Sequence, residues 1–162
     1  MKIFGKTVSE YFAFQRGLMI VIVVVGLARL TLSLSGVSDA VTKWFSLTAL
    51  AVVGIIYCAV KLVRTGFGGR KHLIPLFVMQ AGTANIIIAA GIAISAVSGK
   101  ENIFSRPEYS GPMVNNQWLH AGGHLLDGFV IGPLIGWVIG SIIMFVVEKL
   151  SGSRRVAVES RT

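Results

Sequence analysis

The sequence is poor in cysteine and in charge, and each shortage excludes a class of protein. Cys58 is the only cysteine among the 162 residues, so an intrachain disulfide and a cysteine-rich metal site are both excluded. Charged residues make up 14% of the chain, against about a quarter in an ordinary soluble domain. Hydrophobic residues make up 54% and the mean hydropathy is +0.75. The composition therefore indicates a membrane protein.

Signatures of common nucleotide enzymes and hydrolases are also missing. No Walker loop, dinucleotide-binding glycine fingerprint, glycosylation sequon or nucleophile elbow occurs, and no internal repeat is visible. The fifteen Lys and Arg residues outnumber the seven Asp and Glu, which gives a formal net charge of +8. Because these basic residues flank apolar stretches, they indicate membrane orientation and not a nucleic-acid partner.

Four apolar stretches are long enough to cross a bilayer, which takes about 20 residues of α-helix. They cover residues 17–36, 44–63, 73–97 and 121–147. A backbone in lipid must satisfy its own hydrogen bonds, so even the Ile- and Val-rich first stretch is expected to be helical. The sequence predicts an all-α, integral membrane four-helix bundle, formed as one domain by residues 1–150. Residues 151–162 are predicted to be a basic, disordered cytoplasmic tail.

The distribution of positive charge predicts how the bundle is oriented. Eleven Lys and Arg residues fall in the N-terminal segment, the connection between the second and third stretches, and the C-terminal tail, and four fall elsewhere. Because an excess of positive charge stays in the cytoplasm, both termini are predicted to be cytoplasmic. Trp44 and Trp118 then fall at the outer interface, where indole rings are enriched. We expect a multi-pass protein of the plasma (inner) membrane, with the lipid bilayer as a partner.

The two larger segments outside these stretches lie at residues 1–16 and 98–120. In the first, Phe4, Val8, Tyr11 and Phe12 would share one face of a helix lying on the inner leaflet, and a disordered basic leader is the alternative. The second is rich in proline and glycine, so little regular structure is expected there. Its apolar residues predict a loop packed on the bundle.

A histidine pair begins the last apolar stretch. On a helix, His120, His124 and Asp127 stand at positions i, i+4 and i+7, so they share a face. Two imidazoles one turn apart can share a metal ion, and a carboxylate can ligate it or orient an imidazole. A haem is a further candidate, because histidine is a common axial ligand. The alternative is that both histidines are interfacial residues without a ligand.

Polar residues also occur inside the apolar stretches. Arg29 and Asn85 each lie about twelve residues from the inner end of their stretch, and Asp127 lies below the outer end of its own. Ionisable groups in a membrane usually face the bundle interior and pair with each other. We therefore expect an intramembrane polar cluster in which Arg29 pairs with Asp127, completed by Asn85 and by Gln80 and Thr83. The alternative is that Arg29 extends to the outer headgroups.

A glycine series is the most regular feature of the last stretch. Gly128, Gly132, Gly136 and Gly140 recur every four residues, which places a groove along one helix face where another backbone can approach closely. The partner is either the third stretch of the same chain, which is rich in alanine, or a second copy. The alternative is that the groove holds a lipid tail, a quinone or an isoprenoid. Pro133 removes one backbone hydrogen bond, so a bend is expected between Phe129 and Pro133.

The connection between the second and third stretches is basic and rich in glycine. Arg64, Arg70 and Lys71 are candidates for binding an anionic lipid headgroup beside the membrane. The alternative is that these charges only set the topology.

Three classes of function remain after these exclusions. The first is a non-catalytic accessory, structural or ligand-binding component, as a homo-oligomer or in a larger membrane complex. The second is a metal- or haem-binding protein acting through His120, His124 and Asp127 at the outer face. The third is a small oligomeric transporter or channel that conducts at the level of Arg29, Asn85 and Asp127. An enzyme is the least favoured, because no substrate or catalytic residue is indicated.

Overall fold

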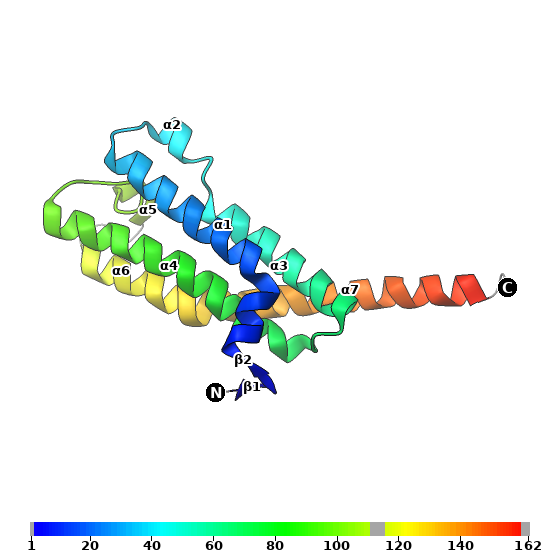
Figure 1. The fold of residues 1–162 in the computed structure, drawn as a ribbon. Helices are drawn as coiled ribbons and strands as arrows, with labels where there is room; N and C mark the ends of the chain where they lie inside the picture. The colour runs from blue at the N-terminus through cyan, green and yellow to red at the C-terminus, as the bar shows by residue number, and fades with distance from the viewer. Residues whose placement is uncertain (1, 111–115, 160–162) are drawn as a thin grey trace.

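The computed structural model describes residues 2–110 and 116–159, most of which are helical. Four helical segments are long and apolar enough to cross a membrane, which confirms the predicted number of spans and the all-α class. Figure 1 shows them side by side as a bundle, with the last helix extending beyond the others towards the C-terminus. The four segments are Val8–Leu34, Asp39–Thr65, Arg70–Ser98 and Gln117–Ser151.

A small hairpin precedes the first helix. Strand β1 (Lys2–Ile3) pairs with the antiparallel strand β2 (Lys6–Thr7) through a two-residue turn. Phe4 and Gly5 in this turn have φ of 50° and 86°, as a turn that matches the twist of its two strands requires. The prediction for residues 1–16 is therefore wrong in its first half, because these residues form neither a surface helix nor a disordered leader.

Helix α1 (Val8–Leu34) begins at the end of the hairpin and bends after two turns. A capping box starts it: the Thr7 hydroxyl accepts from the Glu10 backbone, and the Glu10 carboxylate accepts from the Thr7 backbone. The bend is at Gln15, whose backbone is not helical (φ −119°, ψ 16°). Lys61, from helix α3 (Leu47–Thr65), donates its ammonium group to the Phe14 carbonyl beside the bend.

Helix α4 (Leu73–Ser98) is the centre of the bundle and follows a 3-10 turn, η1 (Arg70–His72). It packs against α1, against α3 and against both parts of the last span. Its candidate membrane segment is 56% buried, whereas those of the other spans are 22–28% buried. Any polar side chain that faces inward from α4 is therefore placed between helices and away from lipid.

The last span is interrupted where the sequence predicts a bend. Helix α6 (Gln117–Leu126) leads into a π-helical turn, η3 (Asp127–Ile131), and then into α7 (Gly132–Glu159). The Gly132 N–H bonds the Asp127 carbonyl across the wider turn, and Pro133 follows without an N–H of its own. Residues 151–162 were predicted to be a disordered tail, but α7 continues through most of them, to Glu159. Adding residues to a helix that has already formed costs little free energy. Residues 160–162 lie outside the described ranges.

The two ends of the bundle differ, and we name them by their elements. The hairpin end carries β1, β2 and η1, and the loop end carries α2 (Asp39–Thr42) and α5 (Pro107–Ser110). At the loop end the side chains of Ile103 and Phe104 are buried. The Ile103 N–H donates to the Ser33 hydroxyl at 2.8 Å, and Arg106 forms an ion pair with Asp39. This part of the 98–120 loop is packed on the bundle as predicted; residues 111–115 lie outside the described ranges.

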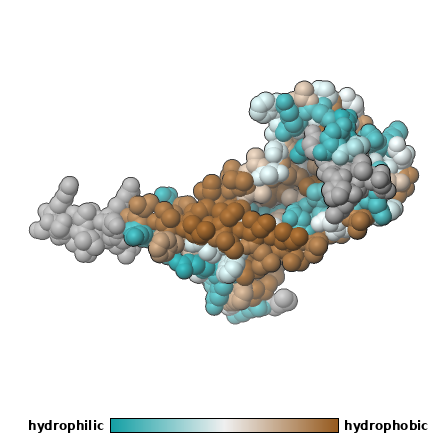
Figure 2. All heavy atoms as spheres, turned by 180° about the vertical axis from the view of Figure 1, so that it is seen from behind, coloured by the Kyte–Doolittle hydropathy of each residue, from teal (hydrophilic) through white to brown (hydrophobic). Residues whose placement is uncertain are grey.

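The surface between the two ends is apolar. Figure 2 shows a continuous brown band of hydrophobic side chains on one face, with hydrophilic residues gathered at the loop end. Large apolar side chains on α6, η3 and α7 are exposed here, including Leu126, Val130, Leu134, Val138 and Ile142. Such a band on four apolar helices fits a multi-pass membrane protein.

Candidate functional site

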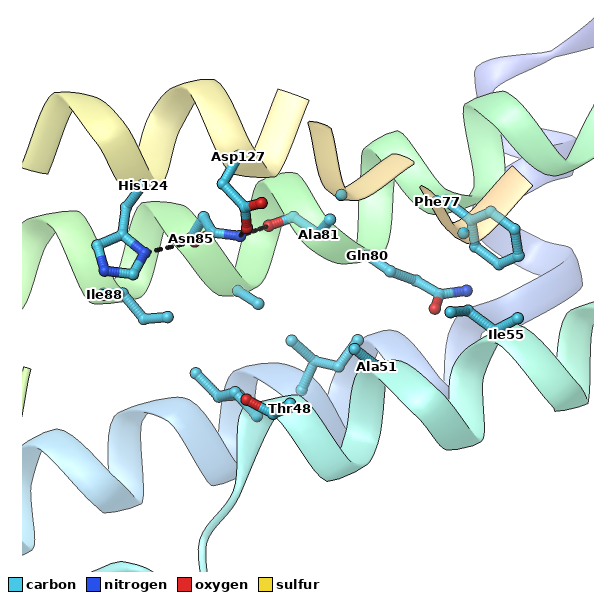
Figure 3. Close-up of a pocket in the computed structure, with 15 residues that line it drawn as sticks. Thr48, Ala51, Ile55, Phe77, Gln80, Ala81, Asn85, Ile88, His124 and Asp127 are labelled. Atoms are coloured by element: carbon cyan, nitrogen blue, oxygen red, sulfur yellow. Dashed lines mark hydrogen bonds between the residues drawn. The ribbon is translucent and has the colours of Figure 1, made fainter. Parts of the chain in front are cut away.

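The bundle encloses a cavity of about 240 Å³ near the middle of α4. Its walls come from α1, α3, α4 and the last span, and most are apolar. Thr48 and Ala51 line it from α3, and both residues are exposed. Figure 3 shows its side chains pointing into the space between α4 and α3. The lining residues include Ile22, Leu47, Ile55, Phe77, Ala84 and Ile88, with five polar side chains: Thr48, Gln80, Asn85, His124 and Asp127.

Three of the polar side chains form the loop-side cluster: Asn85, His124 and Asp127. Asn85 is buried and donates from Nδ2 to the carboxylate of Asp127 at 3.3 Å and to the Ala81 carbonyl at 3.1 Å. Nδ1 of His124 lies 2.8 Å from Oδ1 of Asn85. The π-helical turn begins at Asp127, and π-turns within helices occur frequently at functional sites. The predicted association of Asn85 with Asp127 is therefore present, with His124 as an added member.

The three residues of the predicted metal site, His120, His124 and Asp127, do not all face the same space. The rings of His120 and His124 lie 5.0 Å apart between centroids, but His124 and Asp127 line the cavity whereas His120 does not. His124 directs Nδ1 at Asn85, and Nδ1 of His120 is buried with no hydrogen-bond partner in the part of the chain that the structure describes. Within residues 2–110 and 116–159, no three His, Cys, Asp or Glu side chains are placed to hold a metal ion. Metal and haem binding stay predictions that rest on the histidine pair.

Arg29 lies closer to the loop end than predicted. Its guanidinium carbon is 5.4 Å from the centre of the Phe104 ring, and Phe104 belongs to the packed loop. Gly26, three residues before Arg29, faces Ile87, and Leu30, directly after Arg29, faces Gly91, whereas Asp127 meets Asn85. The structure thus brings Asn85 and Asp127 together and places Arg29 one to two turns above them. The height estimate failed because α1 starts at Val8 and is bent, which shifts its register against α4.

A second polar group, the hairpin-side cluster, was not anticipated as a unit and consists of Gln15, Cys58 and Gln80. Nε2 of Gln80 donates to Oε1 of Gln15 at 2.6 Å and to the Cys58 sulfur at 3.1 Å. Nε2 of Gln15 donates to the Leu76 carbonyl at 3.2 Å. All three side chains are at most 4% exposed. The sequence offered one signal, a glutamine inside each of two apolar helices, but the bend that buries Gln15 is a tertiary feature.

The glycine series faces α4 of the same chain. A Cβ added at Gly128 would lie 2.6 Å from Cβ of Asn85, and one added at Gly132 would lie 3.5 Å from Cβ of Ala81. Cβ atoms at Gly136 and Gly140 would lie 2.9 Å and 3.0 Å from side chains of α4. Gly132 and Gly136 also line the cavity. The third predicted span is therefore the neighbour of this face.

The basic residues proposed to bind lipid headgroups are all exposed at the hairpin end. Arg70 forms an ion pair with Glu148 of α7 at 3.2 Å, and Lys71 lies over the Phe4 ring at 5.5 Å. Gly68 makes room for the His72 ring, since a Cβ there would lie 2.5 Å from it. At least this glycine serves local packing.

Chemically, the cavity offers a carboxylate, an imidazole and an amide in an apolar enclosure. Small-molecule sites have this composition, although such sites usually exceed about 300 Å³ and this one is smaller. Comparison of the chain with protein-family models, with curated proteins and with solved structures gave no match. The cavity and its polar side chains are therefore the main indication of a function.

Proposed function

We propose that this chain is a non-catalytic membrane protein that binds a small molecule in the cavity between α3 and α4. The observation that carries the proposal is the composition of the cavity: apolar walls, with a few polar groups from α3, α4 and the last span. The apolar exterior fits a ligand that arrives through the hydrocarbon of the bilayer.

We propose the plasma membrane as its location, with both termini and the hairpin end in the cytoplasm. The excess of Lys and Arg in the segments that meet there supports this orientation. Arg64, Arg70 and Lys71 would then lie beside anionic headgroups. The exposed apolar band would be covered by lipid, and the glycine series would hold the last span against α4, so that the fold does not require a second copy.

Filling the cavity tests the proposal. Ala51 lines the cavity, whereas its neighbour Val52 is 54% exposed and lies outside the lining. Wild type, Ala51→Phe and Val52→Phe would be extracted with their native lipid in polymer nanodiscs, and the bound small molecules identified by mass spectrometry. We expect a molecule that wild type and Val52→Phe retain in stoichiometric amount and that Ala51→Phe loses.

Identical small-molecule contents in all three proteins, with each one monodisperse, would contradict the proposal. Val52→Phe controls for the added aromatic volume on the same helix. A loss from both variants would assign the effect to α3 as a whole and would also contradict a site in the cavity.

A further inference from the structure

The hydrogen bonds around the cavity determine which polar atoms remain for a ligand. The orientation of Asn85 is fixed by the Ala81 backbone carbonyl, which can only accept and therefore faces Nδ2. Oδ1 of Asn85 consequently faces His124, whose Nδ1 must carry the proton that it donates. In the neutral imidazole, Nε2 of His124 is then left as an acceptor.

The same reasoning fixes Gln80 at the other side of the cavity. Nε2 of Gln15 faces the Leu76 carbonyl, so Oε1 of Gln15 faces Gln80 and takes a proton from it. Nε2 of Gln80 is thereby engaged, and its Oε1 points towards α3, where a Cβ on Gly54 would lie 2.2 Å away. Figure 3 shows this oxygen directed from α4 towards α3.

Among the polar groups of the lining, the carboxylate of Asp127 and Nε2 of His124 are acceptors, and the Thr48 hydroxyl can donate or accept. Oε1 of Gln80 lies against Gly54, which is not among the lining residues. Asp127 receives one described hydrogen bond, from Asn85. Among the described residues that line the cavity, none is Lys or Arg. A carboxylate in a low-dielectric enclosure is costly without a positive partner, so the lining favours a cation that donates hydrogen bonds.

We infer that the ligand of this cavity is a lipophilic amine in its protonated form, with the ammonium group on Asp127 and the hydrocarbon body against the isoleucine and phenylalanine walls. This inference rests on the proposed function and adds the chemical class of the ligand. A bare inorganic cation is disfavoured. Ca²⁺ and Mg²⁺ take six or more ligands, mostly oxygens, and the cavity offers few. Among the described residues, no three His, Cys, Asp or Glu side chains are placed to hold a metal ion.

A matched set of six-carbon probes tests the inference. The probes are n-hexylammonium (a cationic donor), 1-hexanol (a neutral donor), 2-hexanone (an acceptor only) and N,N,N-trimethylhexylammonium (a cation without N–H). Dissociation constants would be measured from ligand-dependent melting temperatures in nanodiscs of zwitterionic lipid. We expect n-hexylammonium to bind at least about tenfold more tightly than each of the other three.

Two carboxylate variants locate the effect. Asp127→Asn should reduce the preference for n-hexylammonium over 1-hexanol to less than about threefold. Glu148→Gln, the same change at an exposed carboxylate of the hairpin end, should leave the preference intact. The comparison among probes on wild type needs no variant, so a folding defect of Asp127→Asn does not remove the test.

The probes separate the ligand class from the binding function. If 2-hexanone, 1-hexanol or N,N,N-trimethylhexylammonium binds wild type as tightly as n-hexylammonium, and Ala51→Phe abolishes binding, the inferred ligand class is overturned while the binding function stands. If the amine preference survives Asp127→Asn, the role of Asp127 is overturned. If no probe binds wild type better than Ala51→Phe, both the ligand class and the use of the cavity by small molecules are overturned.

Discussion

The two polar clusters that α4 takes part in each contain an amide side chain of this helix, but they differ in what they leave open. The hairpin-side cluster and the loop-side cluster each use an amide side chain of α4, Gln80 or Asn85, five residues apart and so about 7.5 Å along the helix. In the first, both amide nitrogens are bonded to groups of the protein and all members are buried. In the second, an imidazole and a carboxylate border the cavity, which the first cluster reaches only through Gln80. The first cluster is suited to hold helices together, and the second to receive a ligand.

The last span holds the loop-side cluster in place, so separating it from α4 should have the largest effect. Gly128→Leu would force side-chain atoms into Asn85, and we expect a loss of about 3 kcal/mol or more of unfolding free energy. The measurement is an SDS titration of the detergent-solubilised protein. Gly122→Leu is the matched control, because a Cβ there meets nothing within 4 Å. Equal losses in both variants would contradict this packing.

Thiol reactivity compares the accessibility of the two regions directly. Cys58 in the hairpin-side cluster is 0% exposed, whereas Thr48 borders the cavity and is exposed. We expect methyl methanethiosulfonate to modify Thr48→Cys, made in a Cys58→Ala background, about a hundredfold faster than it modifies Cys58, because Cys58 must first be exposed by local opening.

Val52→Cys in the same background is the control for exposure to lipid alone. A thiol in hydrocarbon ionises poorly, so it should react more slowly than Thr48→Cys. If Cys58 reacted as fast as Thr48→Cys, the hairpin-side cluster would be accessible to the reagent, which would contradict its burial between the helices.

Removing one member of the hairpin-side cluster should leave its partner unsatisfied. Gln80→Leu deprives the buried Oε1 of Gln15 of its 2.6 Å hydrogen bond, and we expect a cost of about 1–3 kcal/mol. The double variant Gln15→Leu/Gln80→Leu should lose less than the sum of the two single losses, because neither glutamine is then left without the other. Thermal unfolding of the four proteins measures this coupling, and strict additivity would contradict it.

The smallest effect on stability is expected at the cavity. Asp127→Asn keeps an oxygen that can accept from Nδ2 of Asn85, so the unfolding free energy should change by less than about 1 kcal/mol. The same thermal measurement applies. A loss of unfolding free energy as large as that of Gln80→Leu would show that both clusters stabilise the fold. It would contradict the assignment of Asp127 to ligand binding.

Much of the candidate site could be named from the sequence but not assembled from it. His124, Asn85 and Asp127 stood out because polar residues inside apolar stretches are costly and therefore informative. The Arg29 pairing did not follow, because counting residues from the end of a stretch assumes straight helices that start at the apolar boundary. α1 instead starts nine residues before the predicted stretch at residue 17 and bends at Gln15.

The sequence by itself determined the class of the fold. In lipid there is no water to bond the backbone, so the backbone groups of a long apolar run must bond to each other, and the run forms a helix. A glycine every four residues marks the helix face that can approach a neighbouring helix most closely. Only the tertiary structure decided which polar atoms meet and which are left over. A hydrogen bond depends on the relative rotation and height of two helices to within a fraction of an ångström, and those are set jointly by the bend at Gln15, the π-turn at Asp127 and the packing of every span against α4.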